Sequence, residues 1–208
     1  MSCHLRNVLL VIMFLLFTSG IAHPQNNDPT SEIPKIINNA LRVNCPNNNY
    51  AVNVQQRLYN DSNLNISRRP DISFRAKYSP DKGLKLGKIS NNGSNADIDS
   101  PRIMVDLSTY LKSMRTYSNR TINEETDGNQ SYYVIQGGTP NKEQECIIWI
   151  NKDSYAIKRV ILFLSSRQFA RIDVESSQLK TFWLPDKISM KSPENETTAE
   201  LLFTDYSL

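Results

Sequence analysis

The chain has 208 residues, of which 39% are hydrophobic and 22% charged, enough for one domain with a substantial core. Its 24 Lys and Arg against 21 Asp and Glu give a formal net charge of +3, which implies no general polyelectrolyte partner and disfavours nucleic-acid binding. The only histidines are His4 and His23, so a Ser-His-Asp or Cys-His arrangement has no base in the body of the chain.

Residues 1–22 have the three parts of a secretory signal peptide. The apolar run Val8–Phe17 is short for a membrane-spanning helix, which needs roughly 20 residues. Small residues at Gly20 and Ala22 predict cleavage before His23, and no cysteine follows them as in a lipoprotein signal. We therefore expect an exported protein, with an uncleaved N-terminal anchor as the alternative.

Residues 23–30 are polar and contain two prolines, which predicts a flexible lead-in to a single domain over 31–208. Ser31 can cap a helix, and Pro34 is tolerated in its first turn. The expected helix has one apolar stripe at helical spacing, made of Ile33, Ile36, Ile37, Ala40 and Leu41.

Two strands and the start of a third are expected next. Tyr50, Val52, Val54 and Leu58 recur at even spacing, and the alternation is clearest from Ile72 to Tyr78. A turn at Pro80–Gly83 then leads into a strand that begins at Leu84.

A second helix is expected after a polar loop at 90–100. Ser100 would cap it, and Pro101 would occupy its first position. Its apolar residues extend to Met114, and the polar segment Thr116–Ser131 is expected to be loose.

A strand is expected at Tyr132–Gln136, followed by a turn at Gly137–Pro140. The pattern from Cys146 to Tyr206 then predicts four or five short strands separated by turn-forming residues. Such spacing favours an antiparallel sheet over a βαβ enzyme core. The predicted fold class is therefore α+β: a curved antiparallel sheet, an incomplete β-barrel, covered by about two helices.

The sequence offers no catalytic or cofactor motif. No pair of His or Cys has metal-ligand spacing, phosphate-binding glycine patterns are absent, and neighbouring carboxylates lie in polar turns. We expect no cofactor, no metal and no enzymatic activity.

Cys45 and Cys146 are the cysteines left after removal of a signal peptide that contains Cys3. An even pair in an oxidising compartment is compatible with a disulfide. Two unpaired cysteines, one of them buried on a strand, are the alternative, because the sequence fixes no geometry between them.

The strands Ile147–Ile150 and Val160–Leu164 are apolar on both faces, whereas a sheet with one solvated face would alternate. Two explanations stay open: an ordinary core between sheet and helices, or a sheet that curls around a cavity for an apolar ligand.

A basic stretch begins just before the second expected strand and continues through it into the next strand. Its cations could meet a phosphate headgroup, an anionic membrane or an acidic protein, or form a solvated strand face. They are Arg68, Arg69, Arg75, Lys77, Lys82, Lys85 and Lys88.

Several segments in order resemble the LolA-like family of periplasmic outer-membrane lipoprotein carriers, and more loosely the lipoprotein-binding domains of envelope-stress regulators. After an amphipathic helix, Arg69–Arg75 resembles the family's Arg-Pro strand, and Pro101–Leu111 resembles its internal helix. Ile148–Asn151 with Tyr155–Val160 is similar to its Trp-containing hairpin. The last two strands are represented by Leu184–Asp186 and Phe203–Tyr206.

The resemblance implies an incomplete barrel closed by helices, with an apolar cavity for acyl chains. It also implies that an arginine at the Arg-Pro strand, here Arg69 with Arg68 beside it, latches the lid helices. The chain departs from the family at 87–100, which lacks the usual aromatic residues.

We therefore expect a non-enzymatic carrier in the periplasm, or a secreted protein in an organism without one. The expected partners are an acylated lipoprotein or lipid, with membrane-associated donor and acceptor proteins. The rival expectation is an envelope-stress or protein-binding module with a packed core and a basic recognition face. The cavity lining is expected to include Phe74, Tyr78, Trp149 and Phe163.

Overall fold

The computed structural model describes residues 29–59, 71–89, 105–194 and 196–208. The predicted signal peptide, most of the lead-in, and the proposed latch residues Arg68 and Arg69 lie outside these ranges. The described part contains a short 3-10 helix (η1), two α-helices and ten strands. Their bounds are η1 Pro29–Glu32, α2 Ile33–Asn44, β1 Tyr50–Leu58, β2 Ile72–Ser79, β3 Gly83–Ile89, α3 Leu107–Thr116, β4 Asn119–Asp127, β5 Gln130–Gly138, β6 Gln144–Asn151, β7 Ile157–Leu164, β8 Arg167–Leu179, β9 Phe182–Lys191 and β10 Thr197–Ser207.

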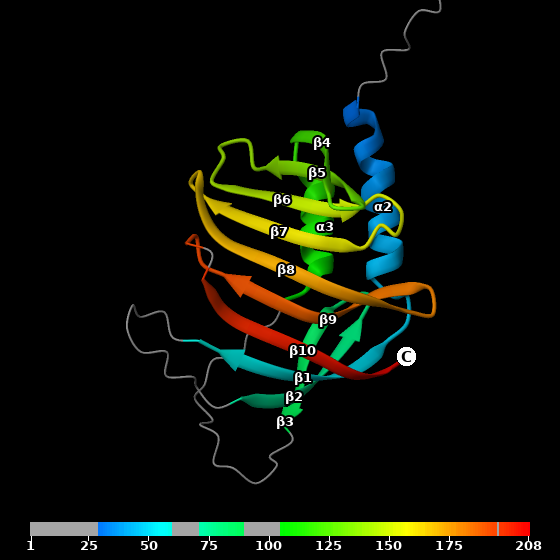
Figure 1. The fold of residues 1–208 in the computed structure, drawn as a ribbon. Helices are drawn as coiled ribbons and strands as arrows, with labels where there is room; N and C mark the ends of the chain where they lie inside the picture. Colours follow the sequence, from blue (N-terminus) through cyan, green and yellow to red (C-terminus); the bar gives the residue numbers. More distant parts are fainter. Residues whose placement is uncertain (1–28, 60–70, 90–104, 195) are drawn as a thin grey trace, which may run out of the picture.

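All ten strands form one antiparallel sheet in the order β3-β2-β1-β10-β9-β8-β7-β6-β5-β4. Strands β4 to β10 follow one another as a meander, and β10 then pairs with β1. Figure 1 shows that the sheet curves and that α2 and α3 lie on its concave side. The sheet does not close, because β3 and β4 are not paired with each other. The expected α+β class and curved antiparallel sheet are thus confirmed.

The core fills the space between the concave face of the sheet and the two helices. In β2 the burial pattern alternates strictly from Ile72, as a strand with one covered face requires. Helix α2 packs against α3 and β9. Fully buried members include Ile37 of α2, Leu111 and Met114 of α3, and Ile148 and Ile150 of β6.

Both helices begin differently from the sequence prediction. Ser31 lies in η1 and does not cap α2, whose first residue is Ile33 and whose N-cap, Glu32, makes no side-chain cap bond. Val105 and Asp106 are not helical, so α3 begins at Leu107, several residues after Pro101. The Asp106 carboxylate accepts a hydrogen bond from the Ser108 backbone N–H at 3.0 Å and supplies the cap.

The segment predicted to be loose forms a regular hairpin. Residues Asn119–Asp127 pair in register with Gln130–Gly138, and Gly128 provides a left-handed residue in the turn between them. Most side chains of β4 are exposed. The sequence prediction was wrong here because this edge strand has no apolar alternation.

Candidate functional site

An apolar pocket of about 330 Å³ lies between α3 and one end of strands β6 and β7. This volume is at the lower end of the roughly 300–1,000 Å³ typical of small-molecule sites. Its walls are mainly aromatic and aliphatic. The lining consists of Thr109, Tyr110, Ser113, Tyr117, Gln144, Glu145, Cys146, Leu162, Phe163, Leu164 and Phe169.

Two exposed apolar side chains form one rim of this pocket. Leu164 is 54% exposed and Phe169 64% exposed, and these are the exposed large hydrophobic residues of the described chain. Ser165 and Ser166 join β7 to β8 with positive φ angles of 48° and 62°, the conformation of a tight hairpin turn. A register shift pairs Leu162 with Ala170 and Phe163 with Gln168, so Phe169 has no partner on β7. The turn and the bulge therefore leave apolar side chains beside the pocket.

Helix α3 supplies the opposite wall through Tyr110 and Ser113, together with Tyr117, the residue that caps its C-terminus. Asp106 fixes the start of this helix and ties it to the β2–β3 hairpin. Its carboxylate accepts a second hydrogen bond from the Leu84 backbone N–H at 3.4 Å. The same carboxylate also lies against Gly83, which has a positive φ of 66°.

Gly137 of β5 allows the end of α3 to approach the sheet closely. A Cβ atom at this position would lie 2.6 Å from Met114 Sδ and 2.9 Å from Tyr117 Cδ2. Ordinary van der Waals contacts of such atoms are about 3.5–4.0 Å. The absence of a side chain at Gly137 therefore sets the position of Tyr117 in the pocket wall.

Three ionisable groups of the pocket wall, those of Cys146, Tyr110 and Tyr117, are held in their neutral forms by burial. Burial raises the pKa of the Cys146 thiol to about 12, and burial also raises the pKa values of Tyr110 and Tyr117. A thiol with so high a pKa is a poor nucleophile at neutral pH. This wall is suited to apolar contact.

The structure separates the four aromatic residues that were expected to line one cavity. Phe163 lies in the wall of the apolar pocket. Phe74 and Tyr78 are buried on the concave face of β2, 2% and 5% exposed, and neither lines this apolar pocket. Tyr78 instead lines a separate open groove with Lys77 and Lys85.

Trp149 lies on the convex face of the sheet, the face opposite Ile148 and Ile150. Its indole N–H donates to Glu125 at 2.8 Å, and the Arg159 guanidinium lies 5.4 Å from the ring centroid. Trp149 therefore does not face the helices, and because both faces of β6 are apolar, the sequence did not show which face they cover.

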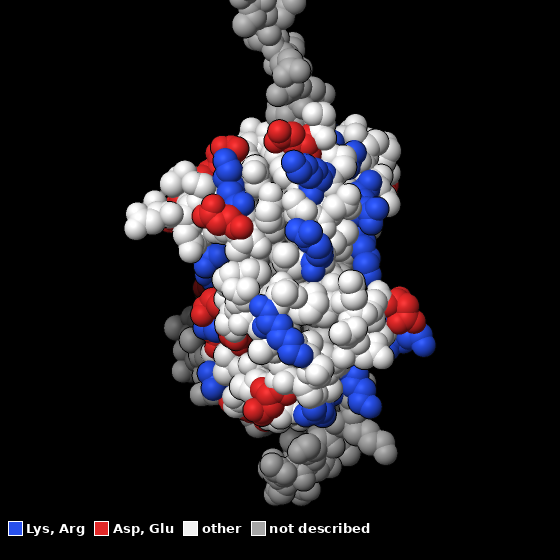
Figure 2. Space-filling model, turned by 90° about the vertical axis from the view of Figure 1, so that its right-hand side faces the viewer, with Lys and Arg blue, Asp and Glu red and all other residues white. Residues whose placement is uncertain are grey.

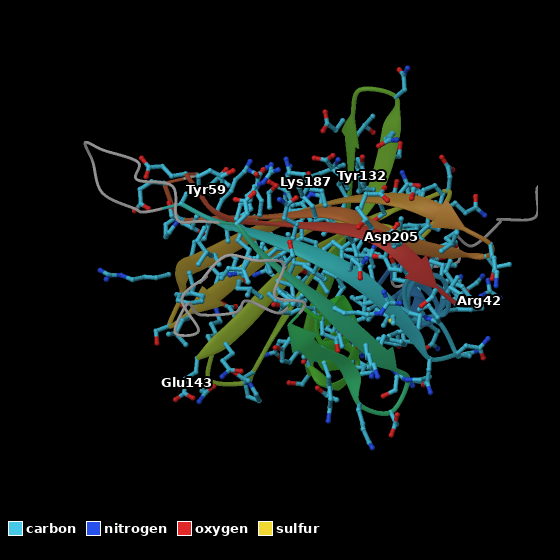
Figure 3. All side chains as sticks on the ribbon, turned by 90° about the horizontal axis from the view of Figure 1, so that it is seen from below. Arg42, Tyr59, Tyr132, Glu143, Lys187 and Asp205 are labelled. Atoms are coloured by element: carbon cyan, nitrogen blue, oxygen red, sulfur yellow. The ribbon has the colours of Figure 1, made fainter. Side chains whose placement is uncertain are left out.

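The convex face also explains the surplus of apolar residues on β6 and β7. Ile147 and Ile161 pair across these strands on this face and are half-buried. Arg171 pairs with Ile161 on the next strand, and the stems of such arginines can cover apolar surface. Figure 3 shows side chains such as Lys187 and Tyr132 on this side of the sheet, away from the helices.

Asp173 is the centre of an ion-pair network on the convex face. Its carboxylate lies 2.8 Å from Arg159, 3.0 Å from Arg171 and 3.1 Å from Lys191. Burial raises its pKa, but the hydrogen bonds from these three cations outweigh burial and lower the pKa below its usual range. The network thus offsets one of the three positive charges gathered here on the convex face.

Cys45 and Cys146 are both free thiols in the structure, so the disulfide that the sequence left open is not formed. Cys45 follows α2 and is hydrogen-bonded to the Tyr78 side chain, and burial raises its pKa to about 12. The two thiols lie in different environments, since Cys146 is buried on β6 beside the apolar pocket.

The basic stretch is partly assembled on the β2–β3 hairpin. Arg75 donates to Asn53 at 2.9 Å and to Ser207 at 3.0 Å. Lys77 pairs directly with Lys85, and both line an open groove of about 550 Å³. Lys82 is exposed near the intervening turn, while the side chain of Lys88 lies outside the described part. Elsewhere, Figure 2 shows Lys and Arg spread over the α2 side of the molecule, with Asp and Glu mainly toward the margins.

Sequence reasoning missed most of the pocket residues. Leu164 and Phe169 flank the Ser165–Ser166 turn, and apolar residues next to so tight a turn were the available signal. Tyr110 was recognised as an apolar residue of a helix, but its helical position did not reveal that it borders a cavity.

No family model matches the chain, and a comparison with curated proteins finds no match. Similar folds are found among solved structures. A LolA superfamily protein from Nitrosomonas europaea has a TM-score of 0.54 and 15% identity, over 85% of this chain and 93% of that one. A domain named for outer membrane lipoprotein sorting, from Vibrio parahaemolyticus, has a TM-score of 0.50 and 13% identity, over 85% and 90% of the two chains.

A DUF1329 family protein from Desulfovibrio piger has a TM-score of 0.51 and 11% identity, over 86% of this chain and 92% of the other. At these identities the similarity concerns the fold. The chain has the LolA-type fold, as its resemblance to that family predicted. Within the described residues, no helix is both long and apolar enough to cross a membrane.

Proposed function

We propose that this protein is a non-enzymatic carrier that holds an acyl chain of a lipid or lipoprotein in the apolar pocket between α3 and β6–β7. The observation that carries the proposal is an apolar pocket with an exposed apolar rim, Leu164 and Phe169, in a fold shared with a lipoprotein-sorting domain. Its volume of about 330 Å³ suits one chain. Burial of about ten methylene groups gives ~8 kcal/mol before the costs of association.

The proposal includes an exported location, because residues 1–22 have the pattern of a signal peptide. A Gram-negative host would place the protein in the periplasm, between a membrane-associated donor and an acceptor. Such a carrier needs no catalytic group or cofactor, and the buried Cys146 thiol with its raised pKa is suited to packing.

The test compares two phenylalanine substitutions at the end of α3. Ser113→Phe places a ring in the pocket, whereas Thr116→Phe lies on the exposed side of the same turn. We expect wild type and Thr116→Phe to bind a fluorescent fatty acid with one-to-one stoichiometry and to release lipid on solvent extraction, as measured by mass spectrometry.

Ser113→Phe is expected to weaken fatty-acid binding at least tenfold while circular dichroism shows the wild-type fold. Lipid-free wild type that also fails to bind the fatty acid would overturn the carrier proposal. Equal binding by Ser113→Phe and wild type would place the ligand elsewhere.

A second candidate function is recognition of an acidic protein through the β2–β3 hairpin. Lys77 and Lys85 are directly opposite, a pairing that is unfavourable without a counter-charge, and neither has an ion-pair partner among the described residues. Salt-sensitive partner binding that is lost in Lys77→Gln/Lys85→Gln, with fatty-acid binding absent, would favour this function.

A further inference from the structure

A polar pocket of about 470 Å³ adjoins the apolar pocket at the base of the β4–β5 hairpin. The two pockets share Glu145 in their walls. They also meet along the chain, because Tyr117 lines the apolar pocket and the next residue, Ser118, lines the polar one. A ligand with an apolar tail and a polar head could therefore use both.

Two cations line the polar pocket, Arg120 of β4 and Lys142 of the β5–β6 turn. Within the described residues neither side chain makes an ion pair or a hydrogen bond, in contrast to Lys152 and Lys187, which contact Glu124 and Glu200 at 2.7 Å. Together with the Glu145 carboxylate they leave one positive charge in the lining. The pocket thus matches a single negative charge.

The backbone around the two cations is fixed by hydrogen bonds and close packing. The Lys142 N–H donates to the Thr139 carbonyl at 2.9 Å, and the Thr139 N–H donates to the Gln144 carbonyl at 2.9 Å. A Cβ at Gly137 would lie 3.3 Å from Arg120 Cγ as well as against Tyr117, so these two side chains lie side by side over β5. The cation and the apolar wall are therefore held next to each other.

We propose that the polar pocket binds the anionic head of an amphiphile whose acyl chain occupies the apolar pocket. The head carries one negative charge, as a phosphodiester does, and the hydroxyl group of Ser118, the residue after Tyr117, lies in the same lining and can supply a hydrogen bond. This inference rests on the proposed carrier function and specifies its ligand as an anionic lipid.

The test uses the full chain and two lipids with the same acyl chain. Lysophosphatidylglycerol has a monoanionic phosphodiester head, and monoacylglycerol has a neutral head. By calorimetric titration we expect wild type to bind the anionic lipid roughly tenfold more tightly, the size of one charge-assisted hydrogen bond. Arg120→Gln/Lys142→Gln should lose this preference and keep its affinity for monoacylglycerol.

Lys112→Gln/Arg115→Gln removes two exposed cations of α3 that line neither pocket and is the matched control, so it should keep the preference. Glu145→Gln removes the carboxylate and should strengthen binding of the anionic lipid. This variant tests the site even if the double substitution at Arg120 and Lys142 does not fold.

Equal binding of the two lipids by wild type, or an unchanged preference in Arg120→Gln/Lys142→Gln, would overturn the headgroup site and leave the carrier function standing. Binding of neither lipid would instead count against the carrier function. Inorganic phosphate is titrated separately: tight binding of phosphate without a preference for the anionic lipid would make this a free-phosphate site and overturn the lipid assignment.

Discussion

Replacing Gly137 by alanine tests whether the close contact between α3 and β5 is as tight as the distances indicate. The added Cβ would lie 2.6 Å from Met114 Sδ and 2.9 Å from Tyr117 Cδ2, so the Met114 sulfur must move by about 1 Å to reach an ordinary contact. Overpacking of this kind costs about 1–3 kcal/mol. Alanine is favoured over glycine in a strand by about 0.5–1 kcal/mol, so the expected net loss is about 1–2 kcal/mol.

The loss can be measured by urea denaturation followed by tryptophan fluorescence. If the free energy of unfolding falls by about 2 kcal/mol per M of urea, the urea concentration at the midpoint of unfolding should fall by about 0.5–1 M. Gly128→Ala is the control, because its Cβ meets nothing within 4 Å and its positive φ of 60° is the only source of strain.

A double substitution separates steric contact from other effects. Met114→Ala alone should cost about 2–5 kcal/mol because Met114 is fully buried. In Gly137→Ala/Met114→Ala the new methyl group fills part of that cavity, so the combined loss should be at least about 1 kcal/mol smaller than the sum. Additive losses, or a midpoint of Gly137→Ala within about 0.2 M of wild type, would refute the close-contact argument.

Three further outcomes are expected from other parts of the fold. Because the pKa of Asp173 is lowered in the folded protein, its ionised carboxylate stabilises the fold above about pH 4. This stabilisation is lost as the pH falls through the lower pKa of the folded state. The free energy of unfolding of Asp173→Asn should therefore depend less steeply on pH in acid than that of wild type. Ser166→Gly should stabilise the protein by about 1 kcal/mol in thermal melts, because glycine adopts the positive φ of 62° without strain. Cys45 and Cys146, whose pKa values are raised to about 12, should react with a thiol reagent at neutral pH only as the protein unfolds, and rapid labelling of the native chain would contradict this.

Those parts of the fold that have strong periodicity were predictable from the sequence. The stripe of Ile33, Ile36 and Ile37 indicated α2, and the alternation from Ile72 to Tyr78 indicated β2, because each has one covered face. Strand β4 has no such pattern, since most of its side chains are exposed and Ile122 is its one apolar residue, so it could not be distinguished from a loop. The start of α3 was misplaced because Ser100-Pro101 and Asp106 are both acceptable helix beginnings in the sequence.

Only part of the candidate site could be predicted. Phe163 is among the residues that line the apolar pocket, whereas Trp149 lies on the convex face of β6, away from the helices and from that pocket. The choice of face depends on where α2 and α3 pack, which is a tertiary feature. The rim residue Phe169 depends on a single register shift between β7 and β8, which local sequence does not specify.

The edge formed by β4 has a consequence for solubility. An edge strand presents unpaired backbone groups to which the strand of another molecule could add, and neighbouring charges discourage such growth into fibrils. β4 carries Arg120, Glu124, Glu125 and Asp127, and its side chains are mostly exposed. A meander that stops short of closure thus has charges along its open edge that oppose the addition of a strand from a second molecule.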